Sequence, residues 1–179
     1  MVDQIADKKI AILKTLSENQ NALLATLKKV NADLFAYRPA VDRWSIAEIV
    51  EHIILVENGV LAGLKKAGMQ PKQEAINKTI SDEALSKMLG NRGRKIDAPA
   101  HFVPKGVFTD KATAIADFTA HRANLADFVH KTDLPLAYIG FPHFAAGMLN
   151  GFDWLVFMTG HCERHIMQME EIIVQGRKV

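Results

Sequence analysis

Cysteine is nearly absent from this chain of 179 residues, which has a single thiol at Cys162. An intrachain disulfide is therefore excluded, and a reducing, cytoplasmic setting is the simplest expectation. No uninterrupted apolar run reaches the ~18 residues of a membrane span, and the first residues lack the apolar core of a signal peptide. The net charge is only +2, which argues against a protein built mainly to hold nucleic acid.

Familiar catalytic motifs are absent as well. There is no glycine-rich loop for a phosphate, no Ser/His/Asp array and no pair of carboxylates placed for acid–base chemistry. Glu57 is five residues from His52, so it lies off that residue's helical face, and the sequence identifies no general base. The basic cluster Arg92, Arg94 and Lys95 is most simply a solvated loop, with contact to an anionic ligand or to nucleic acid as the alternatives.

The sequence is rich in helical periodicity. Nearly half of the residues are apolar (49%), enough for a globular core. Because no segment alternates as a strand does, we predict an all-α fold, a four-helix bundle forming a single domain over residues 1–179. The segment 67–108, punctuated by glycine and proline, is expected to be a long crossover between the second and third long helices. The expected helices are 4–30, 45–66, 82–89 (short), 110–131 and 150–175.

Several helix starts carry capping residues. Ser45-Ile46-Ala47-Glu48 is a capping-box pattern, in which the serine oxygen accepts from a free amide and the glutamate reaches back. Thr109 or Asp110 can cap the third long helix, and Asn150 the fourth. The aromatic-rich segment 138–144 is expected to be a loop.

Two histidines stand on one face of the fourth long helix. His161 and His165 are four residues apart, a spacing that places side chains on the same side of a helix. They continue a core-facing stripe, so they occupy positions where leucines are expected. A buried imidazole costs free energy unless it finds a partner, and either a metal ion or a hydrogen-bonded polar core would supply one. The stripe consists of Trp154, Met158, His161, His165, Gln168 and Ile172.

A third histidine, His52, takes a core position on the second long helix. Sites in helical bundles are built from side chains on facing helices, so His52, His161 and His165 form the natural trio. Three neutral imidazoles can bind Zn²⁺, Ni²⁺ or Fe²⁺, and three protein ligands leave a coordination position open.

Two sequence blocks resemble the signatures of the DinB-like superfamily. The first runs from Arg38-Pro39 to Trp44-Ser45-Ile46-Ala47-Glu48-Ile49-Val50-Glu51-His52. The second comprises His143-Phe144, Gly147, Trp154-Leu155 and His161-x-x-Arg164-His165-x-x-Gln168. The resemblance spans residues 4–175 and implies a DinB-like bundle whose metal ligands are His52, His161 and His165. Members of this superfamily include bacillithiol transferases and mycothiol-dependent maleylpyruvate isomerases, and in several members a metal activates a low-molecular-weight thiol. The resemblance also implies a homodimer, which members often form.

The remaining polar candidates have simpler interpretations. Glu48 is expected to cap its helix, with contact to a ligand imidazole as the alternative, and Gln168 either orients a ligand or edges the core. Cys162 points about 100° away from His161 and is expected to be a packed residue. We expect a turn role for His143, with contact to the site as the alternative. Surface positions are expected for His101, His121 and His130, and a solvated face or an interface is expected for Glu163 and Arg164.

Two classes of function remain open from the sequence. The first is a metal-dependent enzyme, a thiol S-transferase or a hydrolase, which uses Zn²⁺ or Ni²⁺ on a small-molecule substrate and forms a homodimer. The second is a non-catalytic stress-related or binding protein whose metal site is structural or vestigial.

Overall fold

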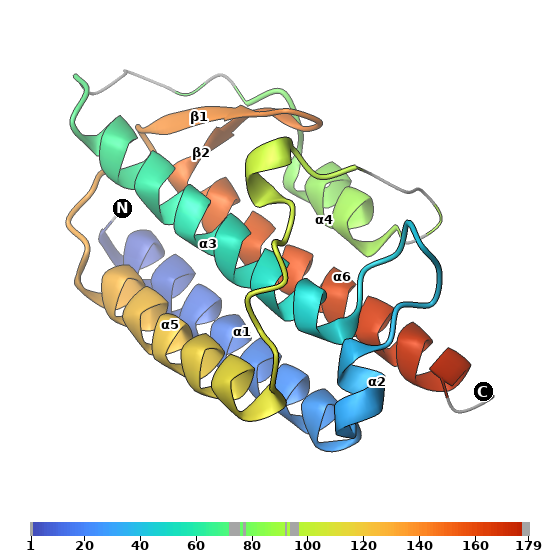
Figure 1. The fold of residues 1–179 in the computed structure, drawn as a ribbon. Helices are drawn as coiled ribbons and strands as arrows, with labels where there is room; N and C mark the ends of the chain where they lie inside the picture. Colours follow the sequence, from blue (N-terminus) through green and yellow to red (C-terminus); the bar gives the residue numbers. More distant parts are fainter. Residues whose placement is uncertain (1, 72–75, 77, 92, 94–96, 177–179) are drawn as a thin grey trace.

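Four long helices form the body of the protein in the computed structural model, which describes residues 2–71, 76, 78–91, 93 and 97–176 (Figure 1). The predicted all-α four-helix bundle is thereby confirmed. Two further helices and a 3₁₀ turn, η1, lie in the connections: α2 (Ala32–Ala36), α4 (Asp82–Gly90) and η1 (Ala100–Phe102). The long helices are α1 (Val2–Lys28), α3 (Ile46–Gly68), α5 (Lys111–Lys131) and α6 (Gly151–Gly176).

The helix starts follow the capping residues that the sequence predicts. Ser45 Oγ accepts from the Glu48 amide at 3.3 Å, and Glu48 Oε2 accepts from the Ser45 amide at 2.9 Å, completing the capping box of α3. Asp110, rather than Thr109, caps α5 through the Thr113 amide at 2.8 Å. Each cap satisfies an amide that has no partner within its own helix, and a cap of this kind is worth about 1 kcal/mol.

The apolar stripes of the helices meet in the interior, where the buried apolar residues form two clusters. At full burial, each aliphatic side chain contributes about 1.5–3 kcal/mol, so this interior supplies the main favourable free energy of folding. The stripe predicted for α6 lies inward at Trp154, Met158 and Ile172, which are at most 6% exposed. Fully buried side chains from three other helices face it, among them Leu23, Leu27, Ile49, Ile53, Phe118 and Leu125.

A short β-hairpin corrects the prediction that the chain has no strand. Strands β1 (Gly140–His143) and β2 (Gly147–Asn150) pair antiparallel where a loop was expected. Two glycines permit this pairing: Gly147 has a positive φ of 71°, and a Cβ on Gly140 would lie 2.3 Å from the Leu149 carbonyl oxygen. The hairpin covers one end of α3 and α6 (Figure 1) and is tied to α6 by the Trp154 indole, which donates to the Phe141 carbonyl at 3.1 Å.

The described part of the long crossover between α3 and α5 packs against α6 and α3. Its predicted short helix is α4, which packs closely against α6, since a Cβ on Gly160 would meet Leu89 at 2.7 Å. After η1, residues 103–109, which we call the strap, run across α3 to the start of α5 (Figure 1). The basic cluster Arg92, Arg94 and Lys95 lies outside the described residues.

Within the described part of the chain, no helix is both long and apolar enough to cross a bilayer.

Candidate metal centre

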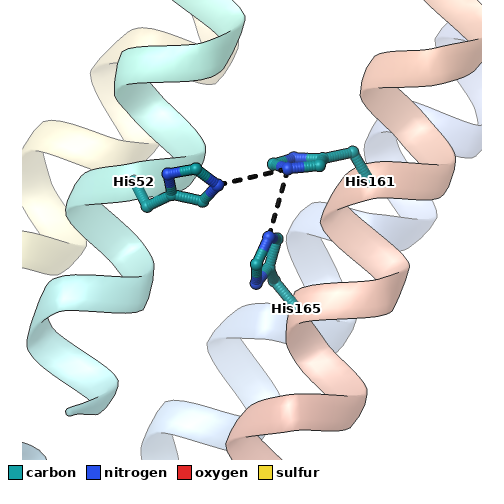
Figure 2. A group of neighbouring side chains, drawn as sticks. All are labelled: His52, His161 and His165. Carbon is teal, nitrogen blue, oxygen red and sulfur yellow. Dashed lines mark hydrogen bonds between the residues drawn. The ribbon is translucent and has the colours of Figure 1, made fainter. Parts of the chain in front are cut away.

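The bundle brings His52, His161 and His165 together between α3 and α6. His52 projects from α3, while His161 and His165 project from successive turns of α6 (Figure 2). Each offers a ring nitrogen to a group whose ligand atoms all lie within 4.8 Å of one another. Nε2 of His161 lies 3.2 Å from Nε2 of His52 and 3.1 Å from Nε2 of His165. The trio expected from the sequence is therefore a real cluster in space.

Outer contacts fix the protons of two of these imidazoles. His52 Nδ1 lies 2.7 Å from the Phe102 carbonyl oxygen, which can only accept, so Nδ1 carries the proton. His165 Nδ1 lies 2.9 Å from Oε1 of Gln168 and is a donor for the same reason. Both rings consequently direct an Nε2 lone pair toward His161, and Gln168 takes the orienting role that the sequence left open.

His161 cannot satisfy both of its neighbours by itself. Its Nε2 faces two lone pairs and can present at most one proton to them, while its Nδ1 is buried without a hydrogen-bond partner. Three Nε2 atoms grouped in this way could share one cation. Imidazole nitrogens about 2.0–2.1 Å from one ion, at angles of about 90–109°, lie about 2.8–3.4 Å apart, so the observed separations are compatible with a shared divalent metal.

Burial lowers the pKa values of two of these histidines, His161 and His52, which favours their neutral forms. The pKa of His161 is held well below its usual range, first by burial and then by the neighbouring His165 and His52. Burial likewise lowers the pKa of His52, against the opposing effect of its hydrogen bond to Phe102. Because a metal binds the neutral imidazole, these lowered pKa values prepare the rings for ligation.

Aromatic rings wall the cluster on two sides. The Trp44 ring centroid lies 4.6 Å from that of His52 and 6.4 Å from that of His165. On the other side Phe157 stacks on His161, with centroids 5.4 Å apart. These rings remove water from the imidazoles and hold them in place. A shallow surface hollow lined by residues 78–83 is separate from this cluster and contains none of its histidines.

His143 lies beside the aromatic wall but outside the trio. Its Nδ1 accepts from the amides of Ala145 at 3.1 Å and Ala146 at 3.0 Å, which is the turn role favoured by the sequence. Its ring centroid is 4.6 Å from that of Phe157, and burial lowers its pKa to about 4. The residue therefore closes the β-hairpin as a neutral imidazole.

Glu48 and Cys162 have the structural roles expected of them. Glu48 accepts from the Ser45 amide and pairs with Arg38, so its carboxylate serves the helix start. Cys162 is fully buried, and burial raises the pKa of its thiol to about 12, which makes it a packed apolar residue rather than a nucleophile.

Two of the predicted surface residues have specific partners. His101, His130 and Glu163 are exposed as expected. His121 is instead largely buried, with its side chain 9% exposed, and its Nε2 lies 2.9 Å from Oε2 of Glu57, because that carboxylate is buried in the core and needs partners. Arg164 is half-buried and donates to the Asn91 carbonyl beyond the end of α4.

Sequence reasoning missed two residues that support the cluster. The Phe102 carbonyl orients His52, and the carboxylate of Glu51 accepts three amides of the strap. Neither has a sequence signature, because each contact involves backbone atoms that only the fold brings close.

Together, the fold and the site define a class of protein: a four-helix bundle with a three-histidine group, between two facing helices, that could hold a metal ion. The sequence model of the DinB superfamily matches residues 15–169. The chain belongs to the DinB superfamily.

Similar proteins agree with this assignment. An uncharacterized protein of Bacillus subtilis (strain 168), YuaE, is 24% identical over 146 residues, covering 82% of this chain and 87% of its own. The crystal structure of TT2238, a four-helix bundle protein, matches with a TM-score of 0.57 and 21% identity, covering 91% of this chain and 98% of its own. YfiT from Bacillus subtilis is described as a probable metal-dependent hydrolase with an unusual four-helix bundle topology. Its structure matches with a TM-score of 0.62 and 14% identity, covering 92% of this chain and 85% of its own. At these identities the two solved structures establish the fold.

Proposed function

We propose that His52, His161 and His165 bind a divalent metal ion, and that the protein is a metal-dependent enzyme. The observation that carries the proposal is the convergence of three Nε2 atoms, two with lone pairs directed at the third, at separations of 3.1 and 3.2 Å. Without a cation, His161 Nε2 can present at most one proton to its two neighbours, so at least one lone pair is left without a well-aligned donor, and a buried polar atom in that state is costly.

The donor set indicates which metals to test first. Three neutral imidazole nitrogens suit Zn²⁺ and Ni²⁺, whereas Mg²⁺ and Ca²⁺ prefer oxygen ligands. A structural zinc site is closed by four protein ligands, and the group found among the described residues contains three. This count favours an open, catalytic site over the alternative of a purely structural metal in a non-catalytic binding protein.

The proposed reaction class is hydrolysis or thiol S-transfer on a small-molecule substrate. A bound divalent metal would supply Lewis acidity, lowering the pKa of a coordinated water or low-molecular-weight thiol. The protein's own contribution is to hold three imidazoles in fixed orientations, with the rings of Trp44 and Phe157 packed against them. Hydrolysis, the first of these two reactions, is supported by YfiT, a structurally similar protein described as a probable metal-dependent hydrolase.

Metal content and activity test the proposal in sequence. Protein purified without chelators is expected to carry stoichiometric zinc or nickel by elemental analysis, and His161→Ala is expected to lose it. His130→Ala, an exposed histidine on α5, is the matched control and should retain the metal. The loaded protein is then assayed against a panel of esters and amides, with and without thiols. Equal metal contents in wild type and His161→Ala would exclude the proposed ligands.

Turnover separates the two functional classes once metal is present. Chelator-sensitive turnover with any member of the panel, lost in His161→Ala and kept in His130→Ala, supports an enzyme. Stoichiometric metal whose removal lowers the unfolding temperature without any turnover on the panel supports the structural alternative.

A further inference from the structure

Glu51 sits next to the proposed ligand His52 in sequence but faces a different part of the molecule. Its side chain is 4% exposed, although a lone buried carboxylate is unfavourable. Three consecutive amides of the strap satisfy it: Lys105 donates to Oε1 at 2.7 Å, and Gly106 and Val107 donate to Oε2 at 2.8 and 3.1 Å. Successive amides that converge on one anion form a concave anion-binding nest, here filled by a side chain of the same protein.

The nest requires an unusual backbone conformation at its centre. Gly106 has a φ of 76°, in the left-handed region that favours glycine, and a Cβ there would meet nothing within 4 Å. The conformation is therefore required by the direction of the amides rather than by lack of space. Most side chains of the strap are exposed, apart from Pro104 and Phe108, so the bonds to Glu51 are its main polar attachment to α3.

The strap is continuous with the group that orients His52. It begins directly after Phe102, whose carbonyl oxygen accepts the Nδ1 proton of His52 at 2.7 Å. The Phe102 ring is held separately against α3, because it fills the space where a Cβ on Gly59 would stand, 2.5 Å from that position. Helix α3 therefore holds Phe102 at two points. The Phe102 ring packs at Gly59, and the amides that follow Phe102 donate to Glu51.

From this arrangement we infer that Glu51 is a positioning residue for the three-histidine centre. Its carboxylate fixes the strap through three hydrogen bonds, and the strap holds the Phe102 carbonyl in place. That carbonyl keeps the proton of His52 on Nδ1, so that Nε2 presents a lone pair. The link to metal affinity rests on the proposed function. The control of the His52 tautomer does not, because the contacts that set it join only atoms of the protein. Partners that orient a ligating histidine typically change metal affinity by about 10–100-fold when removed.

The test compares Glu51→Gln with Glu57→Gln, the same substitution at another buried glutamate of α3 that contacts α5 instead of the strap. Two readouts are used: side-chain ¹⁵N NMR of the metal-free protein, which reports the His52 tautomer, and titration with Co²⁺ followed by visible absorption. We expect wild type and Glu57→Gln to hold the Nδ1–H tautomer and to bind Co²⁺ with similar affinity. Glu51→Gln should show a mixture of tautomers and bind Co²⁺ at least about tenfold more weakly.

A second variant keeps the test decisive if Glu51→Gln does not fold. Gly106→Ala strains the nest from the strap side without a steric clash, and it should change both readouts in the same direction as Glu51→Gln. An unchanged His52 tautomer together with unchanged Co²⁺ affinity in the folded variants would overturn the role of Glu51. If wild type binds no Co²⁺, the proposed function fails, and the NMR of the metal-free protein still decides whether Glu51 controls His52.

Discussion

The buried ion pair between α3 and α5 offers a sharp test of the fold. Arg122 Nη2 lies 2.7 Å from Oε1 of Glu57, and the two side chains are 1% and 0% exposed. His121 contacts the other carboxylate oxygen, and the Arg122 guanidinium lies 4.9 Å from the centre of the Phe118 ring. Replacing Arg122 with methionine keeps much of its length but leaves the carboxylate of Glu57 with His121 as its remaining partner.

The expected loss of stability follows from leaving the buried carboxylate of Glu57 without its arginine partner. Breaking a buried pair by removing one partner costs about 3–5 kcal/mol. His121 still contacts the carboxylate at 2.9 Å, so we expect about 3 kcal/mol, near the lower end of that range. For a domain of this size, that loss lowers the unfolding temperature by roughly 6–12 °C. Arg122→Met/Glu57→Leu removes both charges and should be more stable than Arg122→Met by about 2 kcal/mol.

Urea unfolding of the metal-free protein, followed by circular dichroism, measures these differences. The single variants Arg122→Met and Glu57→Leu and their double variant complete a double-mutant cycle. Lys131→Met is the control on the same helix, because its pair with Asp127 is largely exposed, and it should stay within about 0.5 kcal/mol of wild type. A loss below about 1 kcal/mol in Arg122→Met, or strictly additive effects in the cycle, would refute the reasoning.

Two further predictions concern the histidine centre. The folded-state pKa values of His52 and His161 lie below the usual value near 6.5, so the unfolded chain binds more protons as the pH falls. The contribution of these two histidines to the free energy of unfolding of the metal-free protein should therefore be constant above about pH 7. It should decrease progressively below about pH 6.5, as measured by urea unfolding. Greater stability at about pH 5.5 than at about pH 7.5 would contradict this sign. Gln168→Leu removes the partner of His165 Nδ1 and should weaken Zn²⁺ binding by about 10–100-fold in calorimetry, and an unchanged affinity would show that Gln168 does not orient the ring.

The long helices were predictable because their signals are local. The capping box of Ser45 and Glu48 lies within four residues, and the stripe of α6 repeats at helical spacing, so both predictions needed no knowledge of the fold. The convergence of His52 with His161 and His165 followed from the same reasoning, since core positions of facing helices meet in a bundle.

The β-hairpin and α2 were missed because tertiary contacts or short turns stabilise them. β1 contains Pro142 and β2 is four residues long, so neither shows the alternation of a strand. The hairpin depends on Trp154 donating to the Phe141 carbonyl and on the space left by Gly140. α2 has five residues, too few for a periodic pattern to show.

Polar partners across the fold were missed for a related reason. His121 was expected at the surface, yet it contacts a carboxylate sixty-four positions away in the sequence. The clamp of Glu51 and the carbonyl of Phe102 involve backbone atoms, whose positions no side-chain pattern records.

The surroundings of a bound metal test the central claim most directly. X-ray absorption spectroscopy of the protein loaded with one equivalent of Zn²⁺ should show three imidazole nitrogens at about 2.0–2.1 Å and no sulfur ligand. His161→Ala should lose one imidazole from this shell or fail to hold zinc. A sulfur ligand at about 2.3 Å, or a shell that is the same in wild type and His161→Ala, would contradict a centre built from His52, His161 and His165.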